Sequence, residues 1–322
     1  MVDLVYLWCN GADSVFRKKK EERLKDFRYL SQENVGDIRY CDNEELRYSL
    51  RSVYANIPWV NHIYIVTDNQ VPQWLMPHPK ITIVDHKEII PGELLPTFSS
   101  PMIEMYINRI PGLAEKFLYL NDDVFIAKVM NPSDFFDGER PIVWQTKLAK
   151  VLSFAEALKM TLDDNDQSYN KTLANAWVLY CQSNSEVPYS QPAHLVDAFT
   201  KKIFAYVLKK YPQLYEINSQ PFRTGKEIQR QIFSFEMIHN LGCREVCLSK
   251  PHFFNRLLRK LNLLPNEEFA VTRSSIAKLE RDLALFEPKT FCLNNLEESS
   301  LSQCKALLNR LFPNPAPWEQ ND

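Results

Sequence analysis

The stretch FLYLNDDVF, residues 117–125, places a polar triplet directly after a run of apolar residues. The run at 117–120 is typical of a buried β-strand, and Asn121, Asp122 and Asp123 follow at its carboxyl end. In open α/β sheets, ligands bind at this end of the strands. Adjacent carboxylates need a neutralising cation, and oxygen ligands suit Mg²⁺ or Mn²⁺ held jointly with phosphates. The same residues also favour a turn, so the triplet alone supports a turn and a metal site about equally.

Two other predicted strands end in polar residues as well. Val2–Trp8 is apolar and is followed by Asn10 and Asp13, and His62–Thr67 is followed by Asp68-Asn69-Gln70. The carboxyl ends of parallel strands meet at one edge of a sheet, so these groups are expected to lie together. Three such strand ends indicate a binding site more strongly than one, and a nucleotide is a suitable guest.

Strands and helices alternate along the first half of the chain. A further strand is expected at Ile81–Val84, and helices at Phe16–Leu30, from Asp42 to Asn56 with Asp42 and Glu45 as a capping box, and from Ser99 onward. This order predicts an α/β fold with a largely parallel sheet over residues 1–146.

The second half, residues 147–322, is expected to be mostly helical and to complete the site. An extended, proline-containing tail is expected after Asn294. The helices are expected at Val151–Leu162, Lys171–Tyr180, His194–Tyr211, Gly225–Leu241 and Ser274–Leu285.

Composition excludes several classes of protein. Of the 322 residues, 45% are hydrophobic and 24% charged, which is typical of a folded globular chain. The net charge of −2 argues against nucleic acid as a partner. Neither GxGxxG nor GxxxxGK[ST] occurs, so a glycine loop does not cradle phosphate. Seven scattered cysteines, no signal-peptide pattern and no run long enough for a membrane span indicate reduced thiols and a cytoplasmic protein.

Arginines and one histidine supply candidate complementary groups. Arg47 and Arg51 share a helix face, and Arg109 precedes a turn; each can bind phosphate through two hydrogen bonds, or simply face solvent. His194 lies in PAHLVDAF at an expected helix start, where a neutral imidazole suits a general base. A packing or capping role for His194 is the simpler alternative.

Several long segments resemble the conserved blocks of the Stealth family. The first and second blocks are matched by VDLVYLWCNGAD (2–13), RYCDNEELRYSLRSVYANIPWVNHIYIVTDNQVPQWL (39–75) and the segment from ITIVDHK to NDDVF (81–125). The third is matched by the segment from PAHLVDAF to GKEIQ (192–229), and the short fourth by FCLNN (291–295). These blocks occur in the family's order and cover about half of the chain.

The resemblance implies a nucleotide-sugar-binding α/β core and a sugar-1-phosphate transferase. Such an enzyme moves hexose-1-phosphate, N-acetylhexosamine-1-phosphate included, from a UDP-sugar to a sugar hydroxyl and releases UMP. The implied acceptor is an oligosaccharide or polysaccharide of a capsule or cell surface, and the implied cofactor is Mg²⁺ or Mn²⁺ on Asp122 and Asp123. The resemblance leaves open a peripheral association with capsule machinery at the inner face of the bacterial plasma membrane.

The resemblance also assigns site residues. It implies that His194 is the general base and that Arg223 binds phosphate; Asp123 and Arg109 complete the expected catalytic set. The expected substrate-binding residues are Asp3, Trp8, Asn10, Asp13, Asn121, Arg47 and Ser100. The family pattern is not kept everywhere: Tyr106, Asn108 and Asp197 stand where histidines are common, and the fourth block ends in Asn294-Asn295 rather than Asn-Asp.

Two other functions fit the same residues. A metal-dependent glycosyltransferase also needs paired carboxylates at a strand end, but it releases UDP because the acceptor attacks the anomeric carbon. A non-catalytic sugar-binding protein would use the same cleft without His194 and Arg223. The nucleotide that is released separates all three functions.

Overall fold

A five-stranded sheet forms the centre of the computed structural model, which describes residues 1–148, 152–250, 253–261, 263, 269–273, 275–294 and 301–320. The strand order is β10-β4-β1-β2-β3; the last four strands are parallel and β10 is antiparallel to β4. The largely parallel α/β sheet expected from the sequence is therefore confirmed. The strands are β1 (Val2–Leu7), β2 (Ile63–Thr67), β3 (Ile81–Asp85), β4 (Lys116–Asn121) and β10 (Asp197–Thr200).

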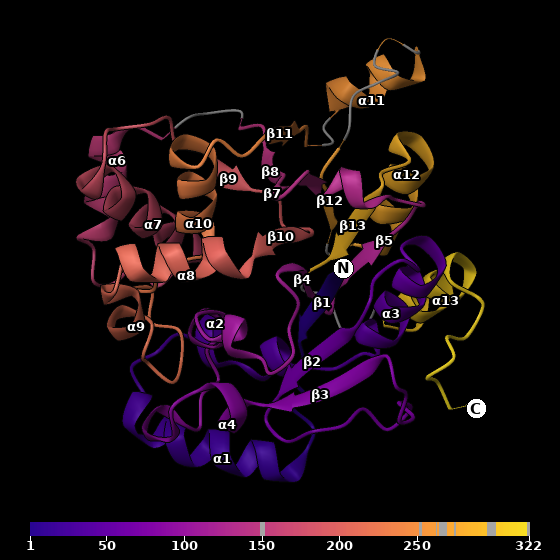
Figure 1. Ribbon diagram of the computed structural model, residues 1–322, viewed down its shortest axis with the longest axis horizontal. Coiled ribbons are helices and arrows are strands. Elements are labelled where there is room, and N and C mark those ends of the chain that lie inside the picture. The colour runs from indigo at the N-terminus through magenta and orange to yellow at the C-terminus, as the bar shows by residue number, and fades with distance from the viewer. Residues whose placement is uncertain are drawn as a thin grey trace.

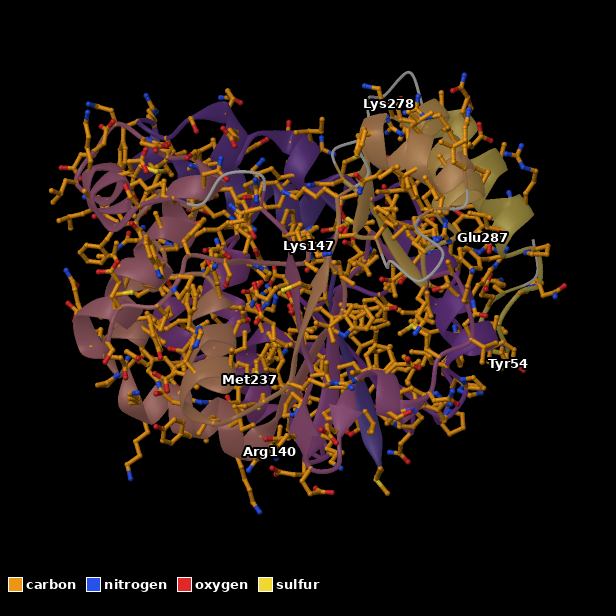
Figure 2. All side chains as sticks on the ribbon, turned by 90° about the horizontal axis from the view of Figure 1, so that it is seen from above. Tyr54, Arg140, Lys147, Met237, Lys278 and Glu287 are labelled. Atoms are coloured by element: carbon orange, nitrogen blue, oxygen red, sulfur yellow. The ribbon has the colours of Figure 1, made fainter. Side chains whose placement is uncertain are left out.

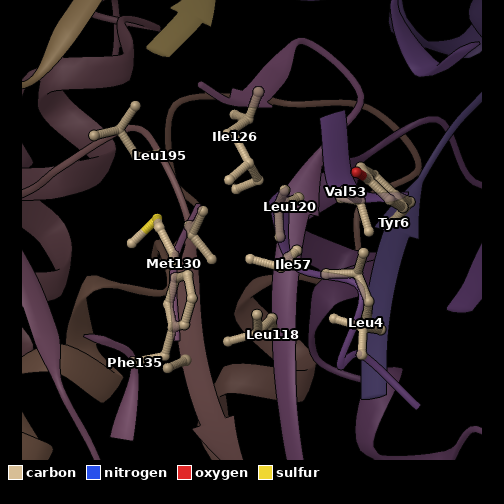
Figure 3. Close-up of a cluster of buried hydrophobic side chains, with 14 of the residues drawn as sticks. Leu4, Tyr6, Val53, Ile57, Leu118, Leu120, Ile126, Met130, Phe135 and Leu195 are labelled. Carbon is tan, nitrogen blue, oxygen red and sulfur yellow. The ribbon is translucent and has the colours of Figure 1, made fainter. Parts of the chain in front are cut away.

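Alternate side chains of these strands pack into two cores, one on each face of the sheet. Leu4 and Leu118 face the first core together with Val53 of helix α3 (Glu45–Asn56) and Ile57, which directly follows that helix, as Figure 3 shows. Val5 faces the second core, on the side of helices α8 and α10. The middle positions of both strands, residues 4–7 and 117–120, are therefore apolar or aromatic, because both faces of the sheet are covered.

Helices lie on both sides of the sheet (Figure 1), with α7, α8 and α10 on one side and α3 and α13 on the other. The remaining helices of the first half are α1 (Ser14–Leu24), α2 (Gln32–Val35), α4 (His86–Ile89) and α5 (Ser100–Glu104). Those of the second half are α6 (Phe154–Thr161), α7 (Tyr169–Ser183), α8 (Lys201–Lys210), α9 (Gln213–Ile217), α10 (Gln231–Phe235), α11 (Phe253–Lys260), α12 (Ile276–Phe286) and α13 (Leu301–Leu311).

Three smaller sheets complete the described part of the fold. They have the orders β12-β13-β5, β11-β8-β9 and β6-β7. Their strands are β5 (Val124–Ile126), β6 (Phe136–Asp137), β7 (Arg140–Pro141), β8 (Val143–Thr146), β9 (Gln191–Pro192), β11 (Glu245–Leu248), β12 (Val271–Arg273) and β13 (Thr290–Leu293). The first of these sheets matters for function, because β5 follows the Asp122-Asp123 turn directly.

The helix expected at His194–Tyr211 was wrong in its first part. Asp197–Thr200 is the edge strand β10, and α8 begins only after Thr200, whose side chain accepts a hydrogen bond from the backbone N–H of Ile203. Phe199 of β10 packs against Phe117 of β4 with ring centroids 5.7 Å apart. Pairing with β4 therefore outweighs the local helical pattern.

The extended tail expected after Asn294 was also wrong, because residues 301–311 form α13. Cys304, Leu307 and Leu308 recur at helical spacing and are buried against the core around Phe125 and Phe291. The prolines that suggested a tail come after this helix has ended. Asn295, Val151 and Ser274 of the other expected elements lie outside the described residues.

Two expected helix starts differ in detail. The helix expected from Gly225 begins at Gln231, since Gly225 has φ +83° and the Glu227 carboxylate accepts its backbone N–H at 3.0 Å. The capping box expected at Asp42 does not form either. Asp42 accepts the backbone N–H of Glu44 at 3.1 Å, and Glu44 itself has φ 66°.

The two halves of the chain share their sheets. Strand β10 of the second half is hydrogen-bonded to β4 of the first, and β13 is hydrogen-bonded to β5. The two ranges, 1–146 and 147–322, therefore differ in their content of strands and helices. Their division into two domains stays a prediction. None of the helices in the described ranges is both long enough and apolar enough to span a membrane.

Candidate active site

Four carboxylates gather where β4 ends. Asp122 and Asp123 form the turn between β4 and β5, and Asp42 and Glu45 reach it from the start of α3. Burial, then Asp123, Glu45 and Asp42, raise the pKa of Asp122 well above its usual range. Among the described residues, none of the four forms an ion pair. This uncompensated negative charge has to be neutralised by protons or by a cation.

Asp123 has one engaged and one unengaged oxygen. Its Oδ2 accepts a hydrogen bond from the Cys292 thiol at 3.3 Å, while Oδ1 is buried without a partner. Burial raises the pKa of Asp123 to about 7, against the opposing effect of the Cys292 hydrogen bond. The backbone carbonyl of Asp123 accepts the N–H of Leu293 at 2.9 Å, so strand β13 fixes the turn. The orphaned oxygen and the clustered carboxylates fit a divalent cation, which Asp122 and Asp123 would hold.

His194 lies across from this turn, in the bend between β9 and β10. Potential ligand atoms of His194, Asp123 and Cys292 all lie within 4.8 Å of one another. His194 Nε2 is 3.4 Å from Asn121 Nδ2. Burial, then the charges of Arg230 and Arg223, lower the pKa of His194 to about 4. The imidazole is therefore neutral at physiological pH and can accept a proton, although it is not at the helix N-terminus that the sequence suggested.

Arginines supply positive charge on the other side of His194. Arg223 donates a hydrogen bond to the hydroxyl of Ser100, another predicted site residue, and among the described residues it forms no ion pair. Burial and the neighbouring Arg223 lower the pKa of Arg39 to about 10. The cluster around Arg223 and Arg39 is suited to binding an anion.

Arg230 is a central residue that the sequence argument missed. Its guanidinium forms ion pairs with Glu104 and, at 2.9 Å, with Asp197, and lies 4.4 Å from the ring centroid of Tyr119. Asp197 occupies one of the positions where the family commonly has histidine, and here it anchors Arg230. No spacing in the sequence could reveal a contact between Arg230 and Glu104, which are 126 residues apart.

We expect Arg230→Met to destabilise the fold by about 3 kcal/mol, because it leaves the buried Glu104 and Asp197 carboxylates uncompensated. Urea unfolding measures this loss. Lys226→Met is the matched control, since it breaks an exposed ion pair with Asp164 and should cost no more than about 1 kcal/mol. Equal stability losses in the two variants would contradict the anchoring role of Arg230.

The loop after β1 approaches the acidic turn, but its polar side chains make local contacts. Burial, then Asp122 and Asp42, raise the pKa of the Cys9 thiol, which follows the buried Trp8. Asn10 Oδ1 accepts the N–H of Ala12 at 2.8 Å. Asp13 caps α1 by accepting the N–H of Phe16 at 2.7 Å. The carboxyl end of β1 is thus near the site, while the structure gives Asn10 and Asp13 roles in shaping the loop.

The structure does not bring Asp3 to the site. Asp3 lies at the amino end of β1, the opposite edge of the sheet from Asp122. Its Oδ1 accepts from Asn61 Nδ2 at 2.8 Å, and its Oδ2 accepts from the backbone N–H of Ala114 at 2.7 Å. The expected substrate-binding role is corrected to a structural one, because both oxygens are engaged and the residue is buried.

Arg47 and Arg109 are corrected in the same way. Arg47 and Arg51 both bind the buried carboxylate of Glu319, which fastens the C-terminal segment to α3, with Arg47 Nε 2.7 Å from Glu319 Oε2. Arg109 is exposed and stacks on the rings of Tyr106 and Tyr215, 4.7 and 5.6 Å from their centroids. Among the described residues, the guanidinium of Arg109 has no contact with the acidic turn.

Fold and site together define an α/β protein whose polar centre lies at the carboxyl ends of parallel strands. The family model for conserved region 2 of Stealth proteins matches residues 39–142. A capsular polysaccharide phosphotransferase of Actinobacillus suis is 43% identical over 318 residues, which cover 97% of this chain and 80% of that protein. The chain therefore belongs to the Stealth family.

Other relatives match over shorter stretches. The capsular polysaccharide phosphotransferase cps1A of Actinobacillus pleuropneumoniae is 43% identical over 70% of this chain and 62% of its own length. LcbA of Aeromonas hydrophila is 41% identical over 42% of this chain and 38% of its own length. Both matches thus span less than two thirds of the relative. A solved structure of the galactosyltransferase LgtC, in complex with donor and acceptor sugar analogs, aligns over 98% of both chains at 11% identity and a TM-score of 0.40.

Proposed function

We propose that this protein transfers hexose-1-phosphate, including N-acetylhexosamine-1-phosphate, from a UDP-sugar to a hydroxyl of a capsular or cell-surface glycan. One observation carries the proposal: the neutral imidazole of His194 lies close to the Asp123 carboxylate and near enough to Arg223 and Arg230 for their charges to lower its pKa. A proton acceptor, a cation site and an anion site are the three elements that phosphoryl transfer requires. The relatives named as capsular polysaccharide phosphotransferases support the same reaction.

In this proposal the acceptor hydroxyl gives its proton to His194 as its oxygen forms a bond to the phosphorus that carries the sugar. The bond from that phosphorus to the bridging oxygen of UMP breaks, and UMP leaves with the electron pair. A divalent cation on Asp122 and Asp123, Mg²⁺ or Mn²⁺, would supply charge neutralisation for the diphosphate. Arg223 would stabilise the charge on the equatorial oxygens, since Ser100 is neutral and leaves its positive charge available.

The bond between the anomeric carbon and its oxygen is untouched in this reaction, so the anomeric configuration is retained. The thiols support a cytoplasmic site of action, since none of the seven cysteines forms a disulfide. The product is a sugar–phosphate–sugar diester within a growing polysaccharide.

A donor labelled with ³²P in the phosphate next to the sugar tests the reaction directly. We expect the label to appear in the glycan, UMP to be the nucleotide released, and phosphorus NMR to show a diester. The control is the same incubation with His194→Ala. Label in released UDP with a phosphorus-free glycan would identify a glycosyltransferase. Binding without release of any nucleotide, across a panel of UDP-sugars and acceptors, would identify a sugar-binding protein.

A further inference from the structure

Helix α11 is packed against the protein by its polar side. Asn255 is only 8% exposed, and Arg256 Nε lies 3.0 Å from Oδ1 of Asp282, a fully buried carboxylate of α12. Arg259 follows Asn255 by one helical turn and so shares its face. A surface helix of a globular protein normally turns this side to water.

The opposite side of α11 presents apolar residues to solvent. Phe254, Leu257 and Leu261 are spaced i, i+3 and i+7, so they form one stripe, and they are 58%, 45% and 59% exposed. Leu263, just beyond, is also exposed. In Figure 1, α11 extends beyond the rest of the molecule at its upper edge. A continuous apolar stripe on a protruding helix indicates an interaction surface.

The last turn of α11 is basic, and Lys260 stands directly beside Leu261 in the sequence. Lys250, Lys260 and Lys278 are exposed, and Figure 2 shows Lys278 at the outer edge of the molecule. Three carboxylates of α12 and its C-terminal end, all within the described residues, have arginine or lysine partners. The pairs are Asp282 with Arg256, Glu280 with Arg310, and Glu287 with Lys128.

We propose that α11 docks the protein on an anionic lipid bilayer, with the stripe of Phe254, Leu257 and Leu261 at the boundary between headgroups and acyl chains. Lysines at the rim of the stripe would meet lipid phosphates. An apolar face flanked by basic residues on a short, protruding helix has the chemistry of an interfacial helix rather than of a groove for a protein segment. This surface lies outside the proposed active site, and its function does not depend on the reaction.

Docking would also place the active site near a membrane. Helix α12, on which α11 packs, leads into β13, and β13 carries Cys292 beside Asp123. A glycan acceptor borne on the same membrane would then be held on the side of the protein that carries α11. This consequence rests on the proposed function, whereas lipid binding itself does not.

Flotation of the full chain with lipid vesicles tests the proposal. We expect binding to vesicles in which phosphatidylglycerol replaces a third of the phosphatidylcholine, and at least about tenfold weaker binding to phosphatidylcholine alone. The double variant Phe254→Ser, Leu257→Ser should lose this binding. Its matched control is Val129→Ser, Leu162→Ser, which removes two side chains that are 71% and 74% exposed elsewhere and should bind like the wild type.

Two further measurements keep the outcomes distinct. Lys260→Glu should weaken binding to the anionic vesicles by about fivefold or more. With a soluble acceptor, the Phe254, Leu257 double variant should release UMP from the UDP-sugar donor at the wild-type rate, so lipid binding and catalysis fail independently. The proposal is overturned if the wild type does not bind anionic vesicles, if the double variant binds them equally well, or if light scattering shows a dimer that only this variant loses.

Discussion

Asp123→Asn is expected to reduce the proposed transfer by about 10³-fold or more. Charge stabilisation by a bound cation supplies several kcal/mol in such reactions, and each 1.4 kcal/mol is about tenfold in rate. The substituted amide would keep the size of the side chain and one oxygen but would remove the charge that holds the cation. Because that charge is buried and uncompensated in the metal-free protein, the variant should fold at least as stably as the wild type.

Cation binding gives a readout that does not depend on activity. We expect Mn²⁺ to raise the melting temperature of the wild type, and we expect electron paramagnetic resonance to detect Mn²⁺ bound to it. Both effects should be lost in Asp123→Asn. Asp137→Asn, at an exposed carboxylate of β6, is the control and should behave like the wild type. Full activity in excess EDTA would contradict a role for a divalent cation in the reaction. Unchanged Mn²⁺ binding by Asp123→Asn would contradict the role of Asp123 in holding it.

His194→Ala is expected to lower the rate of transfer by about 10²–10⁴-fold, the usual contribution of a positioned general base. Binding of the UDP-sugar should persist, because the expected phosphate contacts come from Arg223 and the cation site. His194→Gln should be as slow as His194→Ala, since an amide can hydrogen-bond to Asn121 but cannot take up the proton.

Turnover and donor affinity need to be measured together for these variants. His62→Ala is the control. His62 is only half-buried, and its side chain forms a hydrogen bond with Thr82 of strand β3. Near-normal turnover in His194→Ala would exclude the base role. Loss of UDP-sugar binding together with turnover would instead make His194 a donor ligand or a structural residue.

The sequence predicted the acidic turn because the pattern that marks it, an apolar strand followed by polar residues, is local. The Asp122-Asp123 pair was found because an apolar strand delivers it, and β4 is that strand. Arg223 and Ser100 were each expected at the site, and the structure joins them by a hydrogen bond although they are 123 positions apart. The catalytic roles of these residues stay predictions, which the variants above test.

Residues brought in by long-range contacts were missed. Asp42 and Glu45 were interpreted as a helix cap, yet their charges act on Asp122 across the fold. Arg39 and Arg230 had no motif, because their partners lie on distant segments. Asp3 was assigned to the site by resemblance, and only the strand register shows that it lies at the far end of β1.

The sequence by itself determined the order of strands and helices in the first half and the polar ends of its strands, because apolar runs and turn residues act over a few neighbours. It also determined the family. Only the tertiary structure decided that 197–200 is a strand rather than the start of a helix, and that His194 meets Asp123 and Cys292. The physical reason is that hydrogen bonding to β4 and burial of Phe199 stabilise β10 more than local helical propensity stabilises a helix there. Both contacts are made with residues far away in the sequence, so the neighbouring residues do not predict them.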